Sequence, residues 1–469
     1  MEVALDKKHG LVRALGFWAT ASLLVCNVVG QGIFLKARAI TCDVGSPMTV
    51  LAVWVLAGLL ALCGALTLSE LAAMMPESGG PFVYLRRALG RPLAFAYGWM
   101  MFFLGAPLAA GALAAGGAIF LNLLSGGALE RIRLPLGIAH VSLSGTVLVS
   151  LLMILAIALV NLAKVYTNGL IATVLAVVKI SMLVLLTGGA FLLGNGSFAH
   201  LTMSGAGGSC AGIAAATRGG TLGFAAAIVS ALYAYNGWLT PTLMAGEVKA
   251  PGRNLPLALG AGMLAIIVLY TAANAAYFYV LSPLGVANTS ATSSVGLEVL
   301  GHVFGPQAQG VATALIFISV LATLHVTILS TSRISYAVAE DTSALAWLAR
   351  VSPSSHVPAR SVVTGSVLAA LFVLVGSFDT LSDFEVFSVW IFYLLSAISL
   401  FVLRRREPDA QRPYRVLGYP LIPIVFVASA AWLLLQAGFG APARSLIGLA
   451  IIALAFPVFA LLHRREPAR

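Results

Sequence analysis

Charged residues are scarce in this chain. Only 9% of its 469 residues are charged, whereas 60% are hydrophobic and the mean hydropathy is +0.99. A soluble domain covers its surface with charge, and about 25% charged residues is usual. The composition therefore excludes an ordinary soluble protein and predicts a chain whose outer surface meets lipid.

Several signatures of chemistry are also missing. The sequence has no P-loop of the form GxxxxGK[ST], which argues against ATP hydrolysis by this chain. Its 7 His and 4 Cys are too scattered for a metal site. No nucleophile-and-base pattern indicates a membrane hydrolase. We therefore expect no enzyme activity, no metal and no cofactor.

Four cysteines are too few for a disulfide framework. Cys26 and Cys63 lie inside apolar stretches, where we expect them to pack as small hydrophobic side chains. Cys42 and Cys210 fall in connecting segments. A bond between these two would require both to face an oxidising compartment, and the sequence favours two unbonded thiols.

Apolar stretches of about 20 residues are abundant, and this is the length of a helix that crosses a bilayer. The first runs past residue 30, which is too long for a cleavable signal peptide. We predict an all-α membrane protein with about twelve transmembrane helices. They are expected over residues 14–40, 48–75, 92–124, 138–161, 166–193, 221–246, 255–281, 307–337, 361–378, 382–403, 418–437 and 444–462.

Lys and Arg are distributed unevenly between the connecting segments. Most of the 27 fall on one side of the membrane when the N-terminus is placed inside, including Arg86-Arg87, Arg404-Arg405-Arg406 and Arg412. This follows the positive-inside rule. The net charge of +11 therefore reflects topology and does not indicate a nucleic-acid partner. We predict a multi-pass protein of the cell (inner) membrane with both termini in the cytoplasm.

Two predicted spans contain helix-breaking residues near their middle. The first span carries Val29-Gly30-Gln31-Gly32-Ile33-Phe34, and the sixth carries Tyr235-Asn236-Gly237-Trp238 followed by Pro241. Gly and Pro both weaken a helix. In a membrane, an interrupted helix persists only where protein covers it or where it lines a wet cavity. We therefore predict that helices 1 and 6 are broken.

The two breaks lie five helices apart, as expected for transporters built from inverted repeats with a substrate site at the midplane. N–H groups at a half-helix N-terminus suit a carboxylate, and unwound carbonyls suit an ammonium. The pattern predicts a zwitterionic substrate such as an amino acid. The alternative is that each glycine cluster only permits close helix packing.

These motifs resemble those of the amino acid, polyamine and organocation transporter superfamily. Residues 30–34 are similar to its Gly-Ser-Gly-Ile-Phe element, and residues 70–81 resemble its acidic, Pro-Gly-Gly-rich loop. Residues 235–238 and 246–249 are similar to the sixth-helix region of its L-amino-acid transporter (LAT) branch. Residues 412–415, Arg-Pro-Tyr-Arg, resemble a loop of bacterial members.

The resemblance implies the leucine-transporter fold, in which helices 1–5 and 6–10 are inverted repeats and two more helices follow. The loop over residues 125–137 lacks the Cys by which animal LAT-type transporters bond a glycoprotein, so no disulfide-linked subunit is expected. The implied divisions are a cytoplasmic N-terminus (1–13), the first repeat (14–193), a flexible outside loop (194–220), the second repeat (221–403), and helices 11–12 with a cytoplasmic C-terminus (404–469).

The resemblance also implies which residues bind substrate. Backbone N–H groups at the first break would hold its carboxylate, and carbonyls at both breaks would hold its ammonium. Tyr233 would be an aromatic gate, and Trp390 would help to line the pocket. The implied set is Val28, Gly30, Gln31, Gly32, Ile33, Tyr233, Ala234, Asn236 and Trp390, with the N–H groups of Gln31, Gly32 and Ile33 on the carboxylate.

Two of these residues depart from the family pattern. Gln31 replaces the usual Ser, and its longer side chain could fill space or bond the substrate. Asn236 stands where some members have Gly, which favours smaller cargo unless the geometry of the break compensates.

Lys179 is central in the fifth predicted span, where a cation costs about 2.5–3.5 kcal/mol on insertion scales. In sodium-independent relatives a Lys in helix 5 takes the place of a sodium site, and the resemblance assigns Lys179 to it. Our hypothesis is that its ammonium ties helix 1 to helix 8 near Ser319 or Thr323. A reversible protonation would leave proton coupling open, and a purely structural Lys is the alternative.

Other polar groups also fall in or near spans. His325 is expected to be a neutral core histidine, with a substrate-facing or proton-sensing role as the alternative. Glu70 is near the inside end of span 2, where solvent could reach it, and is assigned a gating or loop-anchoring role. Asp379, Asp383 and Glu385 are assigned to a solvated outside turn, so no acidic side chain is expected in the pocket.

Together these observations predict a sodium-independent exchanger of small neutral L-amino acids that works by alternating access. A proton-coupled amino acid symporter of the same fold is the alternative. A membrane receptor or channel is a third reading, but a receptor would usually carry a soluble output domain, and none is evident.

Overall fold

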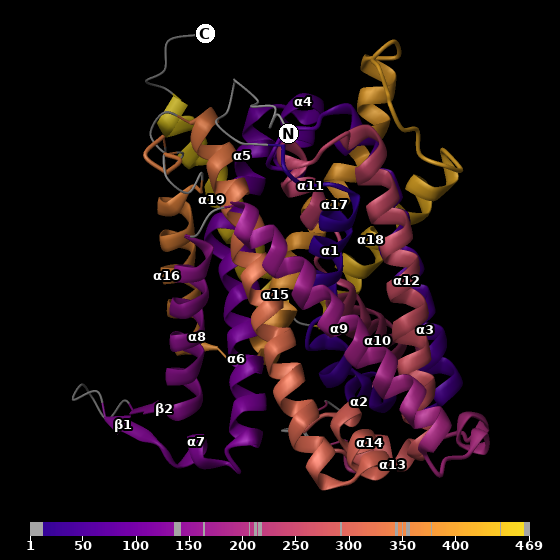
Figure 1. Cartoon of the computed structure of the whole chain (residues 1–469). Helices are drawn as coiled ribbons and strands as arrows, with labels where there is room; N and C mark the ends of the chain where they lie inside the picture. Colours follow the sequence, from indigo (N-terminus) through magenta and orange to yellow (C-terminus); the bar gives the residue numbers. More distant parts are fainter. Residues whose placement is uncertain are drawn as a thin grey trace.

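The computed structural model is a bundle of long helices (Figure 1). It describes residues 13–135, 142–162, 165–205, 207–210, 213, 218–290, 293–342, 346–348, 350–352, 357–376, 378–440 and 442–463. The predicted cytoplasmic N-terminus, apart from residue 13, and residues 464–469 of the predicted C-terminus lie outside this part.

The first half of the chain runs to the end of α9 and is mostly helical. Its helices are α1 (Phe17–Val28), α2 (Gly32–Val44), α3 (Pro47–Met74), α4 (Pro81–Leu89), α5 (Arg91–Met100), a π-helical turn η1 (Met101–Gly105), α6 (Ala106–Leu124), α7 (Ala128–Arg131), α8 (Gly145–Asn161) and α9 (Val165–Leu193).

The second half contains both long helices and short connecting ones. They are the 3₁₀ turn η2 (Phe198–Thr202), α10 (Gly220–Tyr235), α11 (Thr240–Leu243), the 3₁₀ turn η4 (Ala245–Glu247), α12 (Pro251–Val280), α13 (Pro283–Asn288), α14 (Val295–Phe304), α15 (Pro306–Asp341), α16 (Ala359–Val375), α17 (Phe378–Arg406), α18 (Leu421–Gly440) and α19 (Pro442–His463).

The helices have the length and polarity of membrane spans. Within the described part of the chain, eight are long and apolar enough to cross a membrane, and the bent pair α1–α2 makes a ninth. Among the shorter apolar helices, α8, α10 and α16 coincide with the three remaining predicted spans. The prediction of a multi-span helical membrane protein is confirmed, and the count of twelve stays a prediction.

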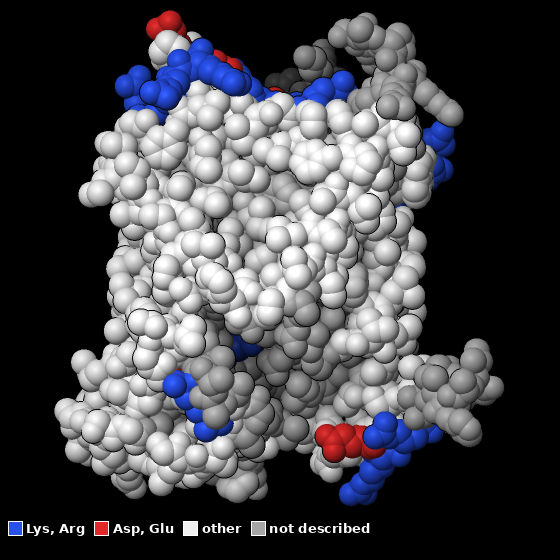
Figure 2. All heavy atoms as spheres, turned by 180° about the vertical axis from the view of Figure 1, so that it is seen from behind, with Lys and Arg blue, Asp and Glu red and all other residues white. Residues whose placement is uncertain are grey.

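The outer surface agrees with this assignment. Figure 2 shows Lys, Arg, Asp and Glu gathered at the two ends of the molecule, with an almost entirely white band between them. Large apolar side chains such as Leu152, Leu185 and Val268 on the long helices are exposed. Such a surface is stable in lipid because hydrocarbon tails replace water around it.

One feature departs from the all-α prediction. Strands β1 (Arg133–Pro135) and β2 (Ser142–Ser144) form a short antiparallel hairpin in which Arg133 is opposite Ser144. The hairpin lies between α7 and α8 at the end of the bundle that also carries α13 and α14 (Figure 1).

Cys42 and Cys210 form a disulfide, so the prediction of two unbonded thiols here is wrong. Cys42 belongs to the last turns of α2, which extends four residues beyond the predicted span. Gly219, which directly precedes α10, is fastened near the same place, because its N–H donates to the Asp43 carbonyl over 2.7 Å. The bond thus joins α2 to the segment that leads into α10.

Glu70 is fully buried, so the prediction that solvent reaches it is wrong. Its carboxylate accepts from the Arg404 guanidinium at 2.6 and 2.9 Å and from the Val416 N–H at 2.7 Å. It is also 3.3 Å from the Arg412 guanidinium. Glu70 therefore fastens the last turn of α17 and the segment after it to α3.

Candidate functional site

Both interrupted helices break at the predicted residues. α1 ends at Val28 and α2 begins at Gly32, with a bend of 45° between them. α10 ends at Tyr235, after which Asn236 is extended and Gly237 has a φ of +102°. A side chain at that φ is strained, which explains the glycine. The chain resumes a helical turn only at Thr240.

The two breaks touch each other. A Cβ added at Gly32 would lie 2.6 Å from the Ala234 Cα, and one at Gly237 would lie 2.6 Å from the Asn27 Nδ2. These distances are shorter than any real carbon contact, so both glycines are needed for the approach. The glycines therefore serve close packing, and they also bring the two unwound segments to one place.

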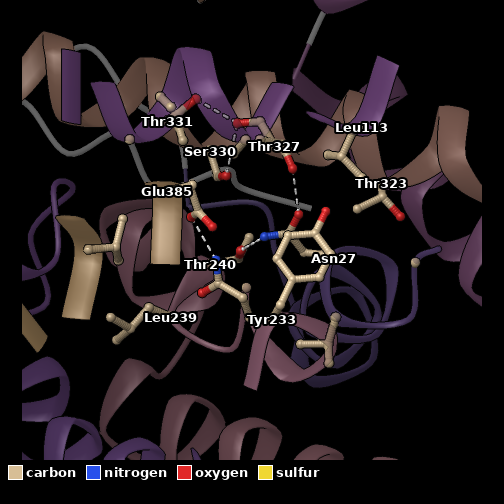
Figure 3. A pocket seen from close by; sticks show the side chains of 18 of the residues that line it. Asn27, Leu113, Tyr233, Leu239, Thr240, Thr323, Thr327, Ser330, Thr331 and Glu385 are labelled. Carbon is tan, nitrogen blue, oxygen red and sulfur yellow. Dashed lines mark hydrogen bonds between the residues drawn. The ribbon is translucent and has the colours of Figure 1, made fainter. Parts of the chain in front are cut away.

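A cavity of about 90 Å³ lies beside these breaks. Its walls come from the breaks themselves and from η1, α6, α15 and α17 (Figure 3). Of the predicted substrate-binding residues, seven line it: Val28, Gly30, Gln31, Gly32, Tyr233, Ala234 and Asn236.

Gln31 fills part of this space. Its Nε2 donates to the Ala112 carbonyl over 3.2 Å and to the Tyr233 hydroxyl over 3.4 Å. The side chain occupies the position that a Cβ on Gly116 would take. Gln31 thus fills space against Gly116 and donates to the Tyr233 hydroxyl, and a bond from Gln31 to the substrate stays a prediction.

The carbonyls of Val28 and Ala234 have a partner that the sequence did not reveal. Tyr270 on α12 donates its hydroxyl to Val28 O over 2.8 Å, and Ala234 O lies 3.3 Å from the same hydroxyl. Tyr270 is fully buried and packs edge-on against Trp54. It therefore ties the last turn of α1 to the last turn of α10.

Lys179 projects from α9 and is buried. Its ammonium donates to the Cys26 carbonyl on α1 and to the Thr323 hydroxyl on α15. The geometry is the one hypothesised, with Thr323 rather than Ser319 as the partner. Ser319 is buried one turn earlier on α15, and its carbonyl accepts from the Thr323 hydroxyl over 3.1 Å.

Glu385 is buried and lines the cavity, so its assignment to a solvated turn is wrong. The reason is that α17 begins at Phe378, which places Glu385 two turns inside the helix. Its Oε1 accepts from the Asn236 Nδ2 over 2.7 Å, and the Asn236 Oδ1 accepts from the Tyr393 hydroxyl over 3.2 Å. The helical spacing of Glu385, Val389 and Tyr393 on one face was the available signal.

Hydroxyl groups of α15 form another wall of the cavity (Figure 3). Thr327 donates to the Asn27 Oδ1 over 2.7 Å, and the Asn27 amide donates to the Thr240 hydroxyl. Asn27 thus connects α1, α11 and α15. Thr323 was predicted only as a partner of Lys179, and the other three were not predicted, although Thr323, Thr327, Ser330 and Thr331 recur at helical spacing.

Other predicted residues lie away from the cavity. Trp390 does not line it, because its position on α17 turns the indole toward Tyr393 and Phe426. Its predicted part in lining the substrate pocket therefore stays a prediction. Ile33 and His325 are buried outside the lining, and the His325 carbonyl accepts from the Asn161 amide over 3.2 Å. The arrangement gives no support to a substrate-facing His325.

Comparison with known proteins gives a consistent result. The model of the family described as amino acid permease matches residues 15–462. The serine/threonine exchanger SteT of Bacillus subtilis is 27% identical over 431 residues, which cover 91% of each chain. The human b(0,+)-type amino acid transporter 1 is 24% identical over 92% of this chain and 83% of its own. The mouse Asc-type amino acid transporter 1 is 26% identical over 98% and 82%.

Proposed function

Because the chain belongs to the amino acid permease family, we propose that it is a sodium-independent transporter that exchanges small neutral L-amino acids by alternating access. The observation that carries this proposal is the cavity enclosed by the two helix breaks. The first N–H groups of a helix lack intrahelical partners and attract an anion. The start of α2 at Gly32 therefore offers the substrate carboxylate a place beside the break.

Sodium independence is supported by Lys179. Its ammonium bonds α1 and α15 directly, at the Cys26 carbonyl and the Thr323 hydroxyl. A fixed cation between these two helices links them, as a bound metal ion would. A sodium ion added at the same place would be repelled by the ammonium.

Exchange of small substrates is supported by the relatives and by the cavity. SteT is named a serine/threonine exchanger, and it covers nearly the whole of this chain. The Gln31 side chain fills the space against Gly116 and limits the volume beside the first break. Both features favour cargo smaller than the large apolar amino acids.

The topology completes the proposal. Twelve spans with two inverted repeats would place both termini in the cytoplasm of a cell that carries the protein in its plasma (inner) membrane. The Cys42–Cys210 disulfide supports this orientation, because disulfides persist on the oxidising side of a membrane and both cysteines are on the predicted outside. We expect the chain to act without a disulfide-linked glycoprotein subunit.

Uptake into vesicles tests the function. Purified protein in liposomes, either empty or loaded with an unlabelled amino acid mixture, is given labelled L-alanine or L-serine without sodium. Exchange predicts uptake only into loaded vesicles. Uptake into empty vesicles that grows with an inward proton gradient would instead establish the symporter. Absence of uptake and of binding for every amino acid would refute the substrate class.

A further inference from the structure

Among the described residues that line the cavity, one carries a carboxylate, and its two oxygens are in different situations. Glu385 is 4% exposed. Its Oε1 accepts from the Asn236 amide over 2.7 Å, whereas no described residue donates a hydrogen bond to its Oε2. A buried acceptor without a donor is destabilising and rare in folded proteins. Here it lies in the wall of the proposed substrate cavity.

The orientation of this carboxylate is fixed by its neighbours. Tyr393 donates to the Asn236 Oδ1, which leaves the Asn236 Nδ2 to face Glu385. Asn236 belongs to the unwound part of the sixth-helix break, so the substrate and Glu385 meet the same segment. Figure 3 shows the Glu385 carboxylate among the side chains that line the cavity.

Those hydroxyl groups already use their protons elsewhere. Ser330 and Thr331 donate to the Thr327 carbonyl, and Thr327 donates to Asn27. Their hydroxyl oxygens are therefore available to the cavity only as hydrogen-bond acceptors. Among the described lining residues there is no Lys, Arg or His to neutralise Glu385. This end of the cavity therefore presents hydrogen-bond acceptors to a bound molecule.

We propose that Glu385 Oε2 is the subsite for the substrate side chain and selects amino acids whose side chain carries a hydrogen-bond donor. This inference rests on the proposed amino acid transport and narrows its substrate class. A hydroxyl or an ammonium two bonds from the α-carbon would supply the missing donor. An apolar isostere would leave Oε2 unsatisfied, and a site of this kind rejects such analogues strongly.

Isosteric competitors test the inference in wild-type protein. The assay measures how L-threonine and L-valine inhibit exchange of labelled L-alanine, and likewise L-serine and O-methyl-L-serine. We expect threonine to inhibit at a concentration at least about tenfold lower than valine. Serine should outcompete its methyl ether, which keeps the oxygen but lacks the proton. L-2,3-diaminopropionate separates the two donor types, because stronger inhibition than by serine would identify an ammonium.

Glu385→Gln tests the residue itself, since it keeps an acceptor for Asn236 and replaces Oε2 with a donor. We expect the preference for serine over its methyl ether to fall to within about twofold, because the Gln amide N–H donates equally well to a hydroxyl and to an ether oxygen. A Glu385 that only positions Asn236 would lower all exchange equally and leave that preference unchanged, which would overturn the inference. Glu77→Gln, on an exposed pair with Arg86, is the matched control.

The wild-type comparison decides the matter if the Glu385 variant does not fold. Equal inhibition by threonine and valine in vesicles that exchange alanine would remove this inference and leave the proposed function intact. Vesicles that exchange no amino acid would refute the proposed function itself.

Discussion

Gly32 is a residue at which the two interrupted helices approach each other closely. A methyl group there would meet the Ala234 backbone, which cannot move aside as a flexible side chain could. We expect Gly32→Ala to lower exchange at least about tenfold, because overpacking of this size costs about 1–3 kcal/mol and separates the breaks. Initial rates of exchange, normalised to protein in the vesicles, measure this.

Gly188→Ala is the control for that substitution, since a Cβ at this position on α9 meets nothing within 4 Å. It should exchange at the wild-type rate. Normal exchange by Gly32→Ala would show that the contact between the breaks is dispensable.

Lys179 should be required for transport. Lys179→Ala removes the donor shared by the Cys26 carbonyl and the Thr323 hydroxyl, and α1 loses its tie to α15. We expect exchange to fall at least about tenfold, because buried polar groups would be left unpaired. Lys249→Ala, which removes an exposed Lys, should have little effect. If Lys179→Ala exchanges normally, the sodium-replacement hypothesis is wrong.

Single residues differ in how far the sequence revealed them. Lys179 was predictable, because a cation at mid-span needs partners and Thr323 was a nearby candidate. Glu385 was not, because acidic residues near a predicted helix end are usually solvated and the start of α17 was placed too late. Tyr270 gave no signal, since a buried Tyr in an apolar span has many packing roles.

Whole elements were predicted better than side chains. The two breaks were found because Gly and Pro disfavour a helix wherever they occur. The helices α8, α10 and α16 fall short of a full span in the structure, yet their apolar sequence marked their places. The β1–β2 hairpin was missed, since each strand has three residues and carries no clear alternation.

The buried Glu70 carboxylate on α3 binds Arg404 and Arg412, which are distant from it in the sequence. Removing one partner of a buried ion pair costs about 3–5 kcal/mol, so Glu70→Ala should lower the melting temperature in detergent by several degrees. Glu77→Ala is the control, because its pair with Arg86 is largely exposed and such pairs contribute about 0–1 kcal/mol. Equal melting temperatures of the two variants would contradict a stabilising role of the Glu70 ion pairs.

At the scale of the whole molecule, the Cys42–Cys210 disulfide indicates which end of the helix bundle faces the oxidising side of the membrane. With Cys42 and Cys210 bonded, only Cys26 and Cys63 remain as thiols. Alkylation of the denatured protein, measured by mass, should add two groups without reductant and four after reduction. Cys42→Ser should add three in either case. Four groups without reductant in the wild type would show that the cysteines do not face an oxidising compartment.

The central claim is that the amino acid occupies the cavity between the helix breaks. Ala109 lines this cavity from α6 and is partly accessible. We would introduce Ala109→Cys after replacing Cys26 and Cys63 by Ala, and measure its reaction with a small thiol reagent. Leu152→Cys on the exposed face of α8 is the control.

The account predicts that a saturating transported amino acid slows the reaction at position 109 severalfold and leaves position 152 unchanged. Equal rates at position 109 with and without an amino acid that the same protein exchanges would place the substrate elsewhere and contradict the account.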